Sequence, residues 1–204
     1  KPSEIEDKDA ITLTHLGSHL AYKGRKLEIG GTAVYSNSDV LLNSSNQAPY
    51  AQFSKSDKAQ QFNLGVDYNY IIRNFNFFGE ASTSIGGGSA VLFGMMASLD
   101  PRLSVSILYR NFDRNYYHMM VNPFSEVSTK SQNEKGLYAG VEAKLTRAIK
   151  FSGYIDKFSF PWLNSSSNTP TSGVDYLAQL NWKPSKKLEM YVRYKQEVKG
   201  RNGK

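Results

Sequence analysis

Apolar and polar residues alternate with a period of two along most of this 204-residue chain. In the segment 188–195, every even-numbered residue is apolar or aromatic, and three of the four odd-numbered residues are charged. Successive side chains of a β-strand point to opposite faces, so this alternation predicts strands with one apolar and one polar face. Helical periodicity is nearly absent. The sequence predicts ten strands, at 11–22, 27–36, 60–70, 75–84, 89–99, 102–112, 136–145, 149–160, 173–183 and 188–198.

The predicted connections alternate in length. Tight turns follow the first, third, fifth, seventh and ninth strands, whereas long loops at 37–59, 113–135 and 161–172 follow the second, sixth and eighth. The fourth strand ends instead in the short glycine segment 86–88. Most strands are about ten residues long, which is the length of a tilted strand that crosses a bilayer. Alternating short and long connections are typical of outer-membrane barrels, with short turns periplasmic and long loops outside.

The expected fold is therefore all-β: an antiparallel transmembrane β-barrel of about ten meander strands that is part of a larger barrel. It forms one outer-membrane segment over 1–204, with a leader at 1–10, strands over 11–198 and a tail at 199–204. The leader and the tail both have loop character. An open sheet would leave unpaired backbone groups at its two edges, which lipid cannot satisfy. We expect the end strands to pair with further strands of a longer parent chain or with other outer-membrane proteins.

Composition narrows the choice of class. Aromatic residues make up 13% of the chain, which suits strands. The longest nearly apolar run, 90–99, is far shorter than the roughly 20 residues of a membrane helix, which excludes a helical membrane protein. The absence of cysteine rules out disulfides and thiolate metal sites. The formal charge of +7 comes from scattered basic residues, so we interpret it first as a source of solubility.

Charged residues of both signs fall opposite the apolar faces of the predicted strands. They are candidates to face the lumen of the barrel, where they could line an aqueous pore or could pair across a small closed lumen and stabilise it. The mixture of signs favours the structural interpretation, because a selective pore more often shows one sign. The strand at 89–99 is apolar on both faces, so its inward side requires a cover. The lumen-facing candidates are Glu28, Asp67, Glu80, Glu142, Lys144, Lys150, Asp156, Asp175, Arg193 and Lys195.

Aromatic residues gather near the predicted strand ends. Two belts of such residues would lie at the two membrane–water interfaces. The alternative is a soluble sandwich with aromatic residues at the corners of its core. The candidates for the belts are Tyr22, Tyr35, Tyr70, Phe112, Phe160, Trp162, Trp182 and Tyr194.

The sequence contains no strong catalytic, metal-binding or nucleic-acid-binding motif. His15 and His19 lie about 13 Å apart on one face of a strand, too far for one metal ion to bind both. No Gly-x-Ser-x-Gly motif accompanies the serines, and the glycines at 86–88 lack the lysine and the helix of a phosphate-binding loop. The basic residues at 183–204 are not interleaved with base-stacking aromatics. We expect no catalytic residue, no metal, no cofactor and no nucleic acid bound through this segment.

Several short motifs lie in order along the chain. They are Asn122–Glu126 (NPFSE), Gln132–Tyr138 (QNEKGLY), Phe158–Trp162 (FSFPW), Asp175–Leu177 (DYL) and Tyr191–Lys195 (YVRYK), together with the earlier hairpin Tyr22–Gly30. In this order they resemble the barrel region of large Bacteroidetes outer-membrane proteins that carry N-terminal helix-hairpin-helix repeats. The resemblance implies a barrel fold and an outer-membrane location, and it implies no defined activity. Members of that family are much longer and carry repeats that this sequence lacks, so we expect a fragment.

Three hypotheses for function follow. The first is a non-enzymatic outer-membrane β-barrel, acting as a pore, a translocation component or a scaffold of a membrane assembly, with membrane lipid as a partner. The second is a soluble or surface-attached all-β binding module. The third is a barrel-embedded hydrolase.

Overall fold

The structure is a computed structural model that describes residues 12–39, 60–118, 124–126, 132–163 and 167–200. Within these residues the chain forms ten β-strands. No helix in this part of the chain is long and apolar enough to cross a membrane. The strands are β1 (Leu13–Lys23), β2 (Leu27–Ser38), β3 (Gln60–Ile72), β4 (Phe75–Ser84), β5 (Ser89–Asp100), β6 (Leu103–Phe112), β7 (Glu134–Lys144), β8 (Ile149–Phe160), β9 (Thr171–Ser185) and β10 (Leu188–Lys199).

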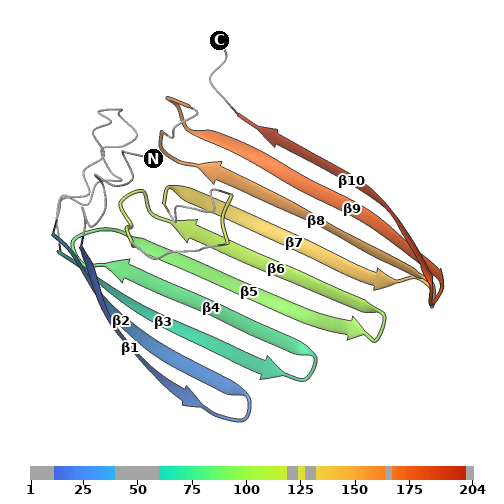
Figure 1. Ribbon diagram of the computed structural model, residues 1–204, viewed down its shortest axis with the longest axis horizontal. Coiled ribbons are helices and arrows are strands. Elements are labelled where there is room, and N and C mark those ends of the chain that lie inside the picture. Colours follow the sequence, from blue (N-terminus) through green and yellow to red (C-terminus); the bar gives the residue numbers. More distant parts are fainter. Residues whose placement is uncertain (1–11, 40–59, 119–123, 127–131, 164–166, 201–204) are drawn as a thin grey trace, which may run out of the picture.

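The ten strands form one curved antiparallel sheet in which each strand pairs with its neighbours in sequence (Figure 1). The all-β antiparallel meander is therefore confirmed, and every strand end lies within two residues of its predicted position. The described sheet is open, because β1 and β10 are its two edges and each pairs with a single neighbour. The alternation of apolar and polar residues explains this agreement, since it repeats at the period of a strand.

The cross-strand register separates the side chains into two faces. On one face, Val105 of β6 lies opposite Val141 of β7, and most side chains of this face are apolar, although Lys157 lies on it opposite Leu137. On the other, Ser106 lies opposite Gly140, and this face carries most of the polar side chains. We call them the apolar face and the polar face. The apolar face is largely uncovered: the exposed fraction is 61% for Val66.

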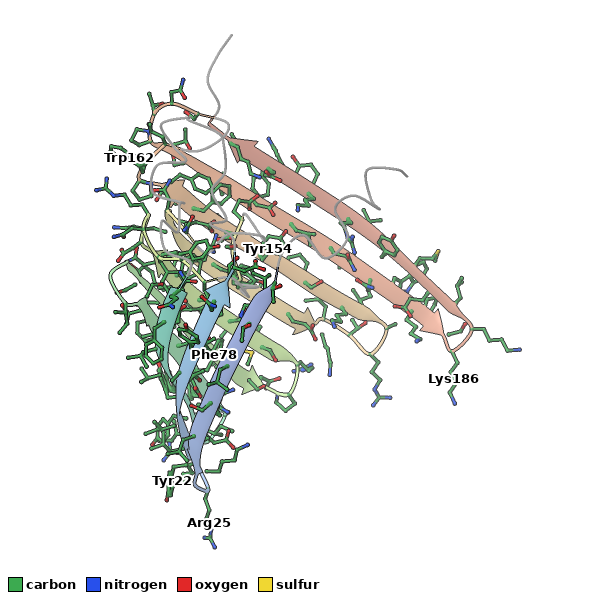
Figure 2. The ribbon with its side chains drawn as sticks, turned by 60° about the vertical axis from the view of Figure 1, so that its left-hand side comes forward. Tyr22, Arg25, Phe78, Tyr154, Trp162 and Lys186 are labelled. Atoms are coloured by element: carbon green, nitrogen blue, oxygen red, sulfur yellow. The ribbon has the colours of Figure 1, made fainter. Side chains whose placement is uncertain are left out.

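The connections are sorted between the two ends of the sheet. The short turns after β1, β3, β5, β7 and β9 all lie at one end, where Figure 2 shows Arg25 and Lys186 at two of the tips. The connections at the other end are longer, apart from the glycine turn before β5, where Gly86 has a φ of 77°. The predicted alternation of short and long connections is therefore confirmed. The predicted loop residues at 40–59 lie outside the described residues.

A small core lies on the polar face at the long-connection end. Ala90 of β5 and Phe112 of β6 are cross-strand neighbours, and Tyr116 from the connection after β6 packs with them. Further along β5, Phe78 lies over Gly94, where an added Cβ would come within 2.2 Å of the ring. The inward side of β5 is thus covered by an aromatic ring and by a loop, as its apolar sequence requires.

Candidate functional site

All ten predicted lumen-facing residues lie on the polar face. The alternation along each strand, combined with the register, places Asp67 opposite Glu80, Lys144 opposite Lys150 and Asp156 opposite Asp175. Glu28, Glu142, Arg193 and Lys195 share this face.

Arg110 of β6 is the centre of a buried ion-pair network on this face. Its Nε donates to Oε1 of Glu134 on β7 over 2.6 Å, and its Nη1 donates to Oδ1 of Asp156 on β8 over 2.9 Å. The side chains of Arg110 and Glu134 are fully buried. Two carboxylates share the charge of one guanidinium, so removal of Arg110 would leave both of them buried without a cation.

A glycine makes room for this network. Gly136 of β7 lies directly opposite Arg110 across the strand pair. A Cβ added to Gly136 would come within 2.3 Å of Cζ of Arg110, so the guanidinium lies flat over the bare backbone. Any side chain at this position would push the guanidinium away from its two carboxylates.

Further ion pairs continue the network toward β10. Lys150 Nζ lies 2.7 Å from Oε2 of Glu142, and Lys195 Nζ lies 3.1 Å from Oδ2 of Asp175. Tyr154 also donates its hydroxyl to Oδ2 of Asp175, over 2.9 Å. The lysine side chains of both pairs are about half-exposed, so solvent screens these pairs and each adds little to the stability of the fold.

The connection between β6 and β7 folds onto the polar face. We call residues 113–133 the β6–β7 loop, of which 113–118, 124–126 and 132–133 are described. Tyr116 donates its hydroxyl to Oγ of Ser82 on β4 over 2.9 Å. The carbonyl oxygen of Tyr117 accepts hydrogen bonds from Nδ2 of Asn63 and Oγ of Ser84. Burial raises the pKa of the Tyr116 and Tyr117 phenols.

The second described part of this loop contacts the opposite half of the sheet. Phe124 packs edge-on against Tyr138, with ring centroids 5.5 Å apart, and lies under the Arg110 guanidinium at 5.6 Å. The backbone N–H of Glu126 donates to the carboxylate of Glu134, and the Glu126 side chain forms an ion pair with Lys199 of β10. The loop is therefore tied to β3 and β4 at one side and to β7 and β10 at the other.

The end of the loop is also joined to the next long connection. Asn133 accepts a hydrogen bond from the backbone N–H of Trp162 over 2.8 Å and donates to the Trp162 carbonyl oxygen over 2.9 Å. The guanidinium of Arg114 lies 4.8 Å from the centroid of the Trp162 ring. Together these contacts hold two connections over one end of the polar face.

The acidic residues in the N-terminal half of the polar face have weaker ion pairs than those around Arg110. Asp67 and Glu80 lie directly opposite each other, an arrangement of like charges that costs stability. His19 Nδ1 lies 3.9 Å from Oδ1 of Asp67, and its closer partner is Oγ1 of Thr32, at 2.8 Å. Both side chains of the His19–Asp67 pair are about half-exposed, so solvent screens this contact.

The histidines of β1 take part in hydrogen bonds with hydroxyl groups. His15 Nδ1 lies 2.9 Å from Oγ of Ser36, and the exposed fraction of Ser36 is only 2%. The described part of the chain contains no group of three histidine or acidic side chains placed to bind a metal ion. The Ser36 hydroxyl is too enclosed to attack a substrate from solvent.

The aromatic belt predicted from the sequence requires correction at two positions. Phe112 and Phe160 are buried on the polar face, because each has the parity of the inward-facing residues of its strand. Trp162 lies beyond β8, in the connection that it shares with Asn133. The remaining candidates lie on the apolar face: Tyr22, Tyr35, Tyr70, Trp182 and Tyr194.

Sequence reasoning missed the two fully buried members of the central network. Arg110 lies in the predicted strand 102–112 but is not among the lumen-facing candidates, and Glu134 lies in the predicted loop 113–135. The signal for Arg110 is its position in the alternating segment 103–110, four residues beyond Ser106 on the same face. No signal in the sequence identifies Glu134, because β7 begins two residues earlier than its apolar alternation does.

Comparisons with known proteins were weak. No protein-family model matches the sequence, and no curated protein matches it. Among solved structures, the KdgM porin aligns over 92% of this chain and 89% of its own, at 10% identity and a TM-score of 0.38. OpdQ of Pseudomonas aeruginosa aligns over 92% of this chain and 58% of its own, at 13% identity and a TM-score of 0.48. OccK5 (OpdH) of the same organism aligns over 92% and 53%, at 12% identity and a TM-score of 0.47. At these values the likeness carries no argument about substrate or mechanism.

Proposed function

We propose that this chain is part of a non-enzymatic β-barrel of the bacterial outer membrane, with its apolar face toward lipid and its polar face toward a lumen. The observation that carries the proposal is the uncovered apolar face. Large aliphatic side chains are exposed on interior strands as well as at the edges: the exposed fraction is 61% for Val66, 53% for Leu137 and 75% for Val192. An exposed apolar patch that follows the whole sheet is costly in water and favourable in a bilayer.

The placement of the loops supports a lumen on the polar side. A soluble sandwich would bury the apolar face against a second sheet and expose the polar face to solvent. Here the polar face holds a fully buried arginine, and the β6–β7 loop folds onto that same face. Strands of 10–15 residues are also long enough to cross a bilayer at a tilt.

The proposed role is that of a pore, a translocation component or a scaffold. The β6–β7 loop reaches from Tyr117 at β3 and β4 to Glu126 at β10, so in a closed barrel it would narrow the lumen. Ion pairs of mixed sign along the wall would keep the lumen wet and hold the loop in place. A barrel-embedded hydrolase has one observation in its favour, the His15–Ser36 contact, and the burial of Ser36 speaks against it.

We further propose that other strands complete the barrel. The free backbone groups of β1 and β10 would be unsatisfied in lipid, so each edge requires a partner strand from a parent chain or from another outer-membrane protein. The resemblance to the Bacteroidetes helix-hairpin-helix outer-membrane proteins supports a longer parent chain. The full-length gene from the source genome tests this point directly, since it would show whether repeats precede the barrel and whether strands follow it.

The proposal is tested with the full-length protein in membranes. We expect it to partition into outer-membrane fractions, to show a heat-modifiable band on electrophoresis and to make liposomes permeable to small solutes. A matched preparation carrying Val66→Arg, on the apolar face, should fail to insert. Full solubility without detergent would contradict the proposal.

A further inference from the structure

An open groove lies on the polar face between the β6–β7 loop and the short turns. Its volume is about 630 Å³, within the roughly 300–1,000 Å³ of small-molecule sites. The groove runs across strands β3 to β9, and Figure 2 shows Tyr154 within the curve of the sheet. Arg110, Glu134 and Asp156 do not line it.

The floor of the groove is built from small side chains on adjacent strands. Ser106 of β6 lies opposite Gly140 of β7, and Ser104 lies in the next row along β6. Ser98 of β5 faces Ser104, and Ser152 continues that row on β8. Such a floor lets a ligand come close to the sheet and meets it with several hydroxyl groups, each of which can donate or accept a hydrogen bond.

Two tyrosines form a wall of this groove. The rings of Tyr138 and Tyr154 lie 5.5 Å apart, with 30° between their planes. Tyr138 leans over Gly140, where an added Cβ would come within 2.7 Å of its hydroxyl oxygen. Tyr154 is fixed by the hydrogen bond from its hydroxyl to Asp175. The rings therefore present apolar surface, and their orientation is set before any ligand arrives.

The charges near the two tyrosines are paired. Arg73 and Glu142 are the two charged residues of the described lining, and Glu142, on the same strand as Tyr138, pairs with Lys150 over 2.7 Å. Arg73 lies in the turn between β3 and β4, three strands away from β7. A charged ligand stacked on the two rings would therefore meet no free counter-charge beside them. Hydroxyl groups, amide groups and flat ring faces instead match a neutral, polyhydroxylated ring compound, whose C–H faces pack on aromatic rings while its hydroxyl groups hydrogen-bond to the floor.

We propose that this groove is a binding site for neutral saccharides on the path through the lumen. The proposal rests on the function proposed above, because it places the ligand on the lumen side of the barrel. Binding is weak and reversible, since the groove is open on one side, as suits a site that a solute must leave as well as enter.

The test uses the full-length protein and maltotriose as the probe, with trigalacturonate as a charged counterpart. In planar bilayers, maltotriose should block the ion current in a saturable way, and trigalacturonate should block it at least tenfold less well. In detergent solution, saturation-transfer NMR should detect maltotriose on the protein. The NMR measurement does not depend on conductance, so it separates a failure of the pore from a failure of the site.

Two substitutions sharpen the test. Tyr154→Ala should raise the half-blocking maltotriose concentration about tenfold. Tyr154→Phe keeps the ring and loses only the hydrogen bond to Asp175, so it should stay within about threefold of the wild type. Tyr176→Ala, on the apolar face, is the matched control and should leave maltotriose binding unchanged. Absence of maltotriose binding by NMR in the folded wild type, or tighter binding of trigalacturonate, would overturn the proposal.

Discussion

The two faces of the sheet reverse the usual relation between polarity and burial. On the apolar face, Leu137 of β7 is 53% exposed, and no described segment covers it. On the polar face, one position further from the short turns along the same strand pair, Arg110 is 0% exposed and contacts two carboxylates. In a water-soluble protein an aliphatic side chain is more often the buried partner and arginine the exposed one. The reversal indicates that the apolar face meets a solvent other than water.

The two faces also differ in the side-chain contacts that hold the sheet together. Contacts across the apolar face are those of neighbouring side chains on the sheet alone. The polar face adds a docked loop and a buried ion-pair network. Changes on the polar face should therefore affect the folded state itself, whereas changes on the apolar face should affect its insertion into a bilayer.

The largest effect is expected from Arg110→Met. This substitution leaves Glu134 and Asp156 as buried carboxylates without their cation, which should lower the free energy of unfolding by about 3–5 kcal/mol. Urea unfolding in lipid vesicles measures it. Arg102→Met is the matched control, because the Arg102 side chain is 72% exposed and its contact with Asp100 is 3.6 Å long. A loss for Arg110→Met no larger than for Arg102→Met would show that the network does not stabilise the fold.

Adjacent residues of β10 separate the two faces directly. Val192→Arg should make folding into the membrane less favourable by about 2–4 kcal/mol if Val192 meets mid-membrane lipid. Arg193→Val, one residue further and on the polar face, should cost less and should alter conductance. Folding yields into vesicles and single-channel currents measure the two effects. Equal tolerance of both substitutions would argue against a membrane strand.

A smaller effect is expected at the loop. Tyr116→Phe removes the hydrogen bond to Ser82 and keeps the ring in its core, so it should weaken loop docking by about 0.5–1.5 kcal/mol. Hydrogen exchange at the Tyr117 amide, which is bound to Ser84, reports this opening. A double-mutant cycle with Ser82→Ala isolates the bond. Additive effects in the cycle would mean that the hydrogen bond does not hold the loop.

The smallest effect concerns ion preference. The double substitution Asp67→Asn with Glu80→Gln removes the acidic pair from the N-terminal half of the polar face. It should lower the cation-to-anion permeability ratio by a factor of about two. Glu142→Gln is the comparison: it removes one acid, which pairs with Lys150, instead of two, so it should shift the ratio in the same direction by a smaller factor. Reversal potentials in a salt gradient measure the ratio, and an unchanged ratio in the double variant would place these acids away from the ion path.

The strands and their facing could be predicted because one rule, alternation with a period of two, specifies both. The ten predicted lumen-facing residues share a face for this reason. The partners of Arg110 could not be predicted, because Glu134 and Asp156 reach it only through the register of β6, β7 and β8. Nearness to a strand end does not predict the facing of Phe112 and Phe160. Their parity along the strand places both on the polar face.

The central claim is that the apolar face meets lipid and the polar face meets water. Strand β3 tests it best, because it has neighbours on both sides and the chain has no cysteine of its own. Six single-cysteine variants at positions 64–69 of the full-length protein, spin-labelled in vesicles, give accessibility to oxygen and to a water-soluble nickel complex. We predict that spin labels in place of Leu64, Val66 and Tyr68 are more accessible to oxygen. Labels in place of Gly65, Asp67 and Asn69 should be more accessible to the nickel complex. Access of the nickel complex to all six positions would contradict it.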